Sequence, residues 1–377
     1  MAIHCIIEKD HLLEGLAALQ NITSKKATTL AVLSNVLIET TTDSLILTAT
    51  DLEVGLRLRI PAQILEAGSI TLPCKKLFEI VRESGSSSLT MEEKENNWII
   101  ITADHSLYNI AGMASAEFPE FPEYEEDNLL SFDAEIFSEL IEKVIYSVSG
   151  EQENIYSLTC VLFEKEKREE RSYLKMVSSD GHRLSFMEKF VTTDIDLLSL
   201  HANTLIPKKG VQELRKFCEN KQKIAIAFDE KQMVVKGDDA VMVVRLKIGD
   251  FPKYESIIKT IQLKKKIKIE RLPFLESLRR INIFTEDIFN SIQMDINENT
   301  MILSSQSADL GNAKDELQVD YKGESLKLAF NCRYFIDTLQ VMDCSSVDVY
   351  INSNNSPCLL RSDIDEGFIS IIMPMQI

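Results

Sequence analysis

Alternating hydrophobic and polar residues recur along the chain and predict β-strands. A period of two sends successive side chains to opposite faces of a sheet, so that one face can be buried while the other meets water. The pattern is clear at residues 45–48, 98–101, 173–177, 233–235, 301–303 and 347–351. We therefore expect antiparallel sheet to be a main element of the fold.

Three further strands lead directly into segments in which apolar residues recur at helical spacing. Asp10 and Asp133 stand where helix N-caps belong, and Pro273 suits a first helical position. The strands are expected at 3–7, 130–132 and 266–269, and the apolar stripes are Leu12, Leu13, Leu16 and Leu19, then Ile136, Phe137, Leu140, Ile141, Val144 and Ile145, then Leu275, Leu278 and Ile281. A strand followed by an amphipathic helix therefore occurs three times.

A second strand-to-helix unit is also repeated, at residues 69–78, 203–211 and 326–335. Its three copies place Lys75, Lys209 and Arg333 at matched positions. Each copy then closes at a proline, which we expect to end the last strand because proline has no N–H for the sheet ladder. These prolines are Pro119, Pro252 and Pro374.

Internal repetition of this kind predicts three tandem domains of one fold. We place them at residues 1–127, 128–258 and 259–377, and we expect each to be α+β, with two helices packed on antiparallel sheets. The acidic run at 123–127 lies at the first boundary and is typical of a solvated linker.

Composition limits the classes of function. The chain has 377 residues and a formal net charge of -18, which repels nucleic acid, so any DNA contact must be confined to a local basic surface. No apolar run approaches the roughly 20 residues that span a bilayer, and the first residues lack an export signal. We expect a cytoplasmic protein that binds no membrane. The seven cysteines are scattered without metal spacing, which predicts reduced core residues.

Basic residues gather in the predicted helices although the chain as a whole is acidic. A solvated polar face would explain any one helix, but recurrence in three copies favours a shared basic surface. If two chains closed head to tail, twelve helices at about 8 to 10 Å spacing would form a circle roughly 30 to 38 Å across. Subtracting one helix width of about 10 Å from this diameter leaves a bore of roughly 20 to 28 Å, which is the scale of a DNA duplex. The basic residues are Lys75, Lys76, Arg82, Lys208, Lys209, Arg215, Lys216, Arg279, Arg280 and Arg333.

Several longer motifs resemble one known family over the whole chain. They include Ser179-Asp180-Gly181-His182-Arg183-Leu184, residues 207–214 and 249–254, and the terminal Met373-Pro374-Met375. They are similar to those of the bacterial DNA polymerase III beta subunit, the beta sliding clamp family. The resemblance implies a non-enzymatic processivity factor without cofactor or metal, which closes as a ring-shaped homodimer around duplex DNA. It also implies a pocket between the second and third domains for linear motifs of the polymerase III catalytic subunit, the clamp loader, other polymerases, mismatch-repair proteins and ligase.

The resemblance assigns individual residues to three surfaces. The ring would be closed by the edge strand at 106–110, with Tyr108 and Ile110, against Ile283 and Phe284 of the other subunit. Lys25, Lys26, Gln152 and Tyr156 would join the helical basic residues in reaching DNA. The peptide pocket would comprise Leu158, Ser179, Gly181, His182, Arg183, Leu184, Pro252, Ile257, Asn331, Tyr334, Ile371, Ile372, Met373, Pro374 and Met375. Ser157, Ser256 and Gln376 depart from the family pattern, which bears on peptide preference.

Parts of the sequence are also compatible with two other classes of function. A hydrolase could use Asp180 and His182, which would share one face of a strand, but no nucleophile, zinc or P-loop motif accompanies them. The segment 363–367 superficially resembles a calcium loop, yet its glycine comes one place early, so a hairpin turn is expected. A scaffold that binds proteins and not DNA would lack salt-sensitive retention on DNA.

Overall fold

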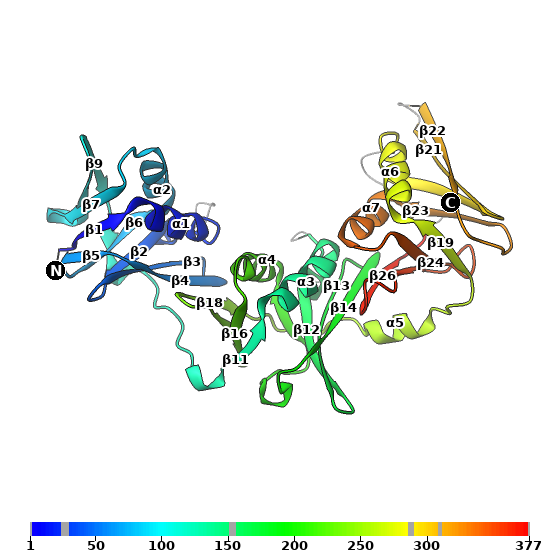
Figure 1. Ribbon diagram of the computed structural model, residues 1–377, viewed down its shortest axis with the longest axis horizontal. Helices are drawn as coiled ribbons and strands as arrows, with labels where there is room; N and C mark the ends of the chain where they lie inside the picture. The colour runs from blue at the N-terminus through cyan, green and yellow to red at the C-terminus, as the bar shows by residue number, and fades with distance from the viewer. Residues whose placement is uncertain (1, 24–29, 151–155, 286–289, 308–310, 376–377) are drawn as a thin grey trace. The chain divides into compact units, whose positions relative to one another are not determined.

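A computed structural model describes residues 2–23, 30–150, 156–285, 290–307 and 311–375 (Figure 1). The chain divides into two compact units. Unit 1 contains residues 1–134, 196–199 and 216–246, and unit 2 contains residues 135–195, 200–215 and 247–377. Each unit consists of antiparallel sheets covered by helices.

Unit 1 holds two sheets. The smaller has the order β5-β1-β7-β8-β9 and the larger the order β10-β6-β2-β3-β4-β18-β17-β16-β11. The smaller sheet is made of β1 (His4–Glu8), β5 (Gln63–Glu66), β7 (Ser88–Glu93), β8 (Trp98–Ala103) and β9 (Ser106–Ala111). The larger is made of β2 (Asn35–Thr40), β3 (Ser44–Thr50), β4 (Val54–Pro61), β6 (Ser69–Pro73), β10 (Met113–Ala114), β11 (Leu130–Asp133), β16 (Lys223–Phe228), β17 (Gln232–Lys236) and β18 (Ala240–Arg245).

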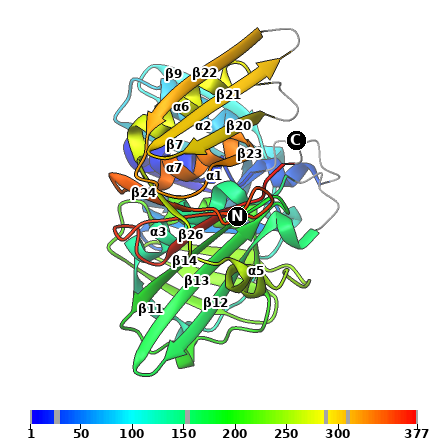
Figure 2. The same ribbon diagram turned by 90° about the vertical axis from the view of Figure 1, so that its right-hand side faces the viewer.

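Unit 2 also holds two sheets, of order β15-β12-β13-β14-β26-β25-β24-β19 and β22-β21-β20-β23. Figure 2 shows the long strands β12, β13 and β14 with helix α5 beside them. The first sheet is made of β12 (Cys160–Arg168), β13 (Arg171–Ser179), β14 (Arg183–Val191), β15 (Thr204–Pro207), β19 (Lys266–Glu270), β24 (Ser346–Tyr350), β25 (Cys358–Arg361) and β26 (Phe368–Ile372). The second is made of β20 (Ser291–Asn297), β21 (Thr300–Ser307), β22 (Gly311–Gln318) and β23 (Leu326–Asn331).

The repeated strand-to-helix units predicted from the sequence are confirmed. Each helix follows its strand directly, and apolar stripes bury one face, as with Leu12, Leu16 and Leu19 of the first helix. The opening units lead into α1 (Lys9–Leu19), α3 (Ala134–Val144) and α6 (Arg271–Asn282), and the second units into α2 (Cys74–Glu83), α4 (Lys208–Cys218) and α7 (Cys332–Val341). A short helix, α5 (Tyr254–Thr260), precedes the third copy.

Three local predictions need correction. Helix α1 begins at Lys9 after Glu8, so Asp10 lies in the first turn and is not the N-cap, although its charge still suits the helix dipole. Pro273 is the third residue of α6, where a missing N–H costs little because the first-turn donors have no intrahelical acceptor. Pro119 and Pro252 come several residues after β10 and β18, so the strands end before the prolines.

Sheet pairing across copies builds both large sheets. In unit 1, β4 of the first copy pairs with β18 of the second, from Val54↔Val244 to Leu58↔Ala240. In unit 2, β14 of the second copy pairs with β26 of the third, from Arg183↔Ile372 to Met187↔Phe368. These antiparallel joints use edge strands that would otherwise expose unpaired backbone groups.

The core of unit 2 runs across its joint. Leu158, Leu184 and Phe186 from the second copy pack in one buried cluster with Tyr350 and Ile371 from the third. The prediction for the cysteines is confirmed, since all seven are buried and free of disulfides. In unit 1, burial raises the pKa of Cys5 to about 12, so its thiol stays protonated and unreactive.

A buried lysine also joins the second and third copies in unit 2. Lys143 of α3 has a side chain that is 2% exposed, and its Nζ lies 2.8 Å from Asp343 Oδ2 and 2.6 Å from Asp365 Oδ1. Nζ also donates to the Val341 carbonyl, so its three donors have three acceptors. All three acceptors belong to the third copy.

The charges of this cluster are stabilised together. Burial lowers the pKa of Lys143, but hydrogen bonds to Asp343 and Asp365 outweigh it and hold that pKa above its usual value. Burial raises the pKa of Asp365, but bonds from Lys143 and Ser362 outweigh it and hold that pKa below its usual value. The stabilisation is therefore present at neutral pH. It is lost as the pH falls through the lowered pKa of Asp365 or rises through the raised pKa of Lys143.

We predict that Lys143→Met lowers the free energy of unfolding at neutral pH by about 3 to 5 kcal/mol, because Asp365 is left charged, buried and without its lysine. Urea unfolding followed by circular dichroism measures this loss, which should shrink in acid once Asp365 is protonated. The control is Lys189→Met, which removes the partly exposed pair between Lys189 of β14 and Glu139 of α3, the helix that carries Lys143. This change should cost less than about 1 kcal/mol. Equal losses for the two variants would contradict the prediction.

Candidate functional site

Unit 2 contains a cavity of about 360 Å³ where the third copy joins the second. Three segments enclose it: the turn between β13 and β14, helix α5, and the ends of β25 and β26. Its lining is Ser179, Gly181, Arg183, Leu184, Ser256, Ile257, Thr260, Pro357, Ile371 and Met373. Cavities of this size with an apolar floor and a few polar groups are the usual shape of a ligand site.

The turn that forms one wall is organised by its own side chains. The Asp180 carboxylate accepts hydrogen bonds at 3.0 Å from the backbone N–H groups of His182 and Arg183. Ser179 Oγ donates to the Arg183 carbonyl at 2.7 Å, and it accepts the Gly181 N–H at 3.1 Å. Gly181 has φ of 87°, which glycine adopts without strain. The sequence Ser179-Asp180-Gly181 therefore specifies a tight turn.

The floor and the opposite wall are apolar. Leu184 and Ile371 are opposite each other in the β14–β26 ladder and are almost fully buried. Met373 continues beyond β26, where its N–H donates to the His182 carbonyl at 2.9 Å, and its side chain is 42% exposed. Ile257 of α5 is 36% exposed. An incoming apolar side chain would meet Met373 and Ile257, and flexible methionine adapts to different shapes.

Arg183 is the charged side chain among the described residues of this lining, and it is already engaged. Its Nε donates to Asp180 Oδ2 at 3.0 Å, its Nη1 to Asp337 Oδ2 at 2.7 Å and its Nη2 to the Tyr146 carbonyl at 2.7 Å. Burial lowers the pKa of Arg183, but the bond to Asp337 and the nearby carboxylates outweigh it and raise that pKa. The guanidinium is therefore a fixed part of the cavity wall and does not present a free charge to a ligand.

The structure brings seven of the predicted pocket residues to this cavity: Ser179, Gly181, Arg183, Leu184, Ile257, Ile371 and Met373. The other eight do not line it. Leu158 and Ile372 are buried, and Pro374 and Met375 follow the lining strand, with Met375 N–H bonded to the Ala329 carbonyl. His182 and Pro252 are exposed, Asn331 caps α7, and the Tyr334 ring lies 4.5 Å from the Arg183 guanidinium carbon.

Two lining residues, Thr260 and Pro357, were not anticipated, and Ser256, which was expected to bear on peptide preference, also lines the cavity. Ser256 and Thr260 flank Ile257 on α5, and helical spacing places Ser256 and Thr260 one turn apart on one face. That spacing could have identified them once the helix was recognised. Pro357 lies just before β25, far along the chain from the other walls, and nothing in the neighbouring sequence indicates its position.

The repeated basic residues lie on helices as predicted. Lys75, Lys209 and Arg333 are each the second residue of α2, α4 and α7. Lys75 and Arg333 are exposed and Lys209 is half-buried. Within the described part of the chain, Lys75, Arg279 and Arg333 form no ion pair at 4.0 Å or less, whereas Lys76, Arg82, Arg215 and Arg280 are paired with Glu79, Glu83, Glu142 and Asp315.

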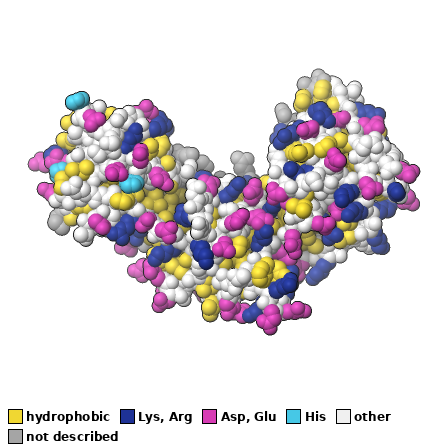
Figure 3. Space-filling model, in the orientation of Figure 1, with side chains coloured by type: hydrophobic (Ala, Val, Ile, Leu, Met, Phe, Trp, Pro, Cys, Tyr) yellow, Lys and Arg dark blue, Asp and Glu magenta, His cyan; other side chains and the backbone are white. Residues whose placement is uncertain are grey.

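Charge outside these helices is mixed. Figure 3 shows lysine and arginine interspersed with aspartate and glutamate over the face in view. Four predicted DNA contacts cannot be placed: Lys25, Lys26 and Gln152 lie outside the described residues, as does the side chain of Tyr156.

Two of the strands at sheet edges concern the predicted subunit contact. The predicted edge strand at 106–110 is found as β9, the last strand of the five-stranded sheet of unit 1, with Leu107 66% exposed, Tyr108 half-buried and Ile110 buried. In unit 2, β22 is one of the two outer strands of the four-stranded sheet. Ile283, just after α6, is 70% exposed, and Phe284 is half-buried.

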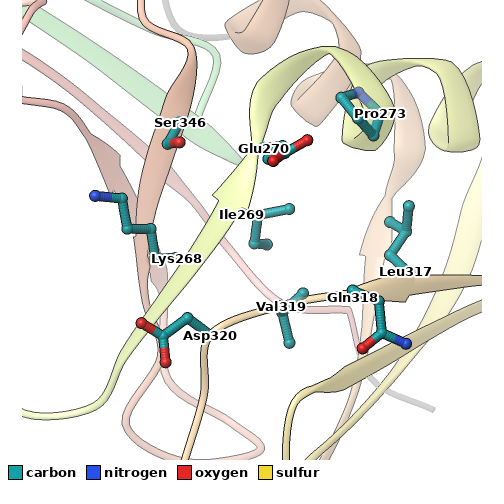
Figure 4. A pocket seen from close by; sticks show the side chains of 9 residues that line it. All are labelled: Lys268, Ile269, Glu270, Pro273, Leu317, Gln318, Val319, Asp320 and Ser346. Carbon is teal, nitrogen blue, oxygen red and sulfur yellow. The ribbon is translucent and has the colours of Figure 1, made fainter.

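A second cavity, of about 500 Å³, lies in the third copy between β19 and the end of β22. Figure 4 shows Ile269, Val319 and Leu317 in its interior, with Lys268, Asp320 and Glu270 around them. Lys268 and Asp320 exchange backbone hydrogen bonds here. Its charged lining residues are one base, Lys268, and two acids, Glu270 and Asp320, whose side chains point apart in Figure 4, so the cavity does not resemble a catalytic site.

The hydrolase alternative finds no support in this geometry, because Asp180 is bound to the turn backbone and to Arg183. The turn after β25 also differs from a calcium loop: Asp365 is bonded to Lys143, and Gly367 adopts φ of 86°. In the residues that the structure describes, no group of histidine, cysteine and carboxylate side chains could hold a metal ion. No helix of that same part is long and apolar enough to cross a membrane.

Family models match nearly the whole chain. Residues 3–122 match the N-terminal domain of the DNA polymerase III beta subunit, residues 131–253 its central domain and residues 261–376 its C-terminal domain. A curated relative named beta sliding clamp, from Chlamydia pneumoniae, is 29% identical over 350 residues and covers 93% of each chain. Another, from Vibrio cholerae, is 25% identical over 373 residues and covers 98% of this chain and 99% of the relative.

Solved structures agree on the fold. A sliding clamp from Bartonella birtlesii bound to griselimycin superimposes with a TM-score of 0.93 at 22% identity, covering 100% of each chain. A DNA polymerase III beta subunit from Thermotoga maritima gives a TM-score of 0.88 at 24% identity, again over 100% of each chain.

Proposed function

Because the chain belongs to the DNA polymerase III beta subunit family, and is thus a non-catalytic sliding clamp of DNA replication, we propose that two subunits close around duplex DNA and tether polymerases through the 360 Å³ cavity. The observation that carries this proposal is the match of all three copies of the repeat, in order, to the three domains of the family. The expected compartment is the cytoplasm, where bacterial DNA is replicated.

Ring closure would join β9 of one subunit to β22 of the other. Both are outer strands whose backbone can accept a further antiparallel neighbour. The exposed side chains of Leu107 and Ile283 would lose their contact with water in such an interface. The contact is head to tail, so it yields a closed dimer when the rotation between subunits is a half-turn.

DNA would be held loosely by the ring. Lys75, Lys209 and Arg333, at one matched position in each copy, would attract phosphates without reading base edges. The net charge of -18 opposes binding by the remaining surface. Retention would therefore depend on closure of the ring around the duplex, which leaves the protein free to slide.

Polymerases and other proteins would bind through short apolar peptides. The floor of Leu184 and Ile371 and the adaptable rim of Met373 and Ile257 suit a few buried side-chain anchors, which supply most of the affinity in such contacts. By the resemblance of its motifs, the peptides would come from the polymerase III catalytic subunit, the clamp loader, other polymerases, mismatch-repair proteins and ligase.

Retention on circular DNA tests the ring. We predict that protein loaded onto nicked circular DNA stays bound through gel filtration and is lost when one cut makes the DNA linear, because the ring can then slide off the ends. Equal retention before and after the cut would mean ordinary surface binding and would contradict the proposal.

Charge reversal tests the basic helices. We predict that Lys209→Glu with Arg333→Glu shortens residence on circular DNA at least about tenfold at moderate salt, because two phosphate contacts become repulsive. The control is Lys231→Glu with Lys322→Glu, an equal change of charge at exposed positions outside the helices. Equal effects of the two pairs would assign the loss to net charge alone.

Truncation of Met373 tests the cavity. We predict that Met373→Ala weakens binding of a labelled synthetic peptide with one glutamine and several leucines by about tenfold, measured by fluorescence anisotropy. The ring should stay closed in size-exclusion chromatography. Leu263→Ala is the matched control, since Leu263 is 46% exposed but does not line the cavity. Unchanged affinity for Met373→Ala would remove the cavity from the binding site.

A further inference from the structure

Helix α7 of the third copy presents one face to the second copy. The residues on this face are Tyr334, Asp337, Thr338 and Val341, which follow the spacing of neighbours on one side of a helix. Each contacts a polar group of the second copy through its ring, its side chain or its carbonyl. We refer to these four residues as the α7 stripe.

Three side chains of the second copy meet the α7 stripe. Arg183 contacts the Tyr334 ring at 4.5 Å and donates to Asp337 at 2.7 Å. The Tyr146 hydroxyl lies 3.1 Å from Thr338 Oγ1, and Lys143 Nζ donates to the Val341 carbonyl. Lys143 is near the end of α3, and Tyr146 lies two residues after that helix ends. One short stretch of chain therefore contacts both Thr338 and Val341 of the α7 stripe.

Arg183 connects the stripe to the cavity. It lines the cavity, yet its side chain is 10% exposed and its guanidinium lies between the rings of Tyr146 and Tyr334, at 5.3 and 4.5 Å. Asp337 does not line the cavity and is 36% exposed. It is the partner from the third copy that accepts a hydrogen bond from Arg183 Nη1.

We propose that Asp337 is a positioning residue for the peptide pocket: by holding Arg183 against the α7 stripe, it keeps the guanidinium out of the space that an apolar peptide must enter. This inference rests on the proposed role of the cavity in peptide binding. It adds a determinant of affinity that contacts no peptide.

The physical reason is the number of fixed contacts on one planar group. Two rings, two carboxylates and one carbonyl hold the guanidinium in place before a peptide arrives, so binding costs no ordering of this side chain. Without the Asp337 carboxylate, Nη1 has no charged acceptor from the third copy. The guanidinium then gains by turning toward the water of the cavity, where it occupies space and presents a charge to an apolar ligand.

The test is Asp337→Asn in the full-length protein, with binding of the same labelled glutamine- and leucine-containing peptide measured by anisotropy. We expect the dissociation constant to rise about fivefold. The unfolding midpoint should change little, because the pair is partly exposed at Asp337. Asp43→Asn is the matched control: it removes the carboxylate partner of Arg59, at 2.9 Å in unit 1, and should leave peptide affinity unchanged.

A double-mutant cycle separates positioning from a general structural effect. If Asp337 acts through Arg183, Asp337→Asn has no further effect in an Arg183→Gln background. Asp337→Glu keeps a carboxylate on a longer side chain and should retain at least half of the affinity that Asp337→Asn loses. This variant also tests the positioning role if Asp337→Asn folds poorly.

The outcomes that overturn the inference are distinct from failure of the proposed function. Absence of peptide binding by the unaltered protein would overturn the role of the cavity itself. If the unaltered protein binds, then equal affinity of Asp337→Asn, an equal effect in both backgrounds, or no rescue by Asp337→Glu would each show that Asp337 does not position Arg183.

Discussion

The antiparallel pairing of β14 with β26 is the interaction on which unit 2 depends. Five residues of each strand are in register, from Arg183↔Ile372 to Met187↔Phe368. The ladder satisfies backbone groups that an isolated copy would leave at an exposed edge, and it brings two apolar faces into one cluster. The pairing of β4 with β18 does the same within unit 1. Repeats that look alike in sequence are thus joined by shared sheets and not by linkers alone.

The cavity is a consequence of that joint. Its floor is the ladder itself, at Leu184 and Ile371, and its walls come from a turn of the second copy and the chain that leaves β26. Neither copy has a complete cavity alone. The proposed peptide pocket therefore exists because the joint is held firmly, which is the contribution of Lys143, Tyr146 and Arg183. Buried polar groups of this kind require a full set of partners, and each of the three has partners in both copies or in the opposing one.

The acidic and basic residues have different proposed roles. The net charge of -18 would oppose binding of nucleic acid by the chain as a whole, while a basic residue recurs near the start of a helix in each copy. Four neighbouring basic residues are paired with carboxylates, whereas Lys75 and Arg333 are exposed and form no ion pair within the described part of the chain, so these two are the better candidates for phosphate contact. A modest number of such contacts suits a protein that must hold DNA and still move along it.

The sequence by itself determined the threefold repeat, the strand-to-helix units and the family. These features depend on side chains that are neighbours along the chain, and their period can be read directly. Helix starts at Asp10 and Pro273 were each misplaced by two residues, because several first-turn positions satisfy the same backbone groups. The tertiary structure alone decided which edges pair across copies and which charges meet. Lys143 and Asp365 are 222 residues apart and Arg183 and Asp337 are 154 apart. Edge strands offer chemically similar backbones and surface charges offer many partners, so the choice among them is made by the packing of whole copies, which no local pattern records.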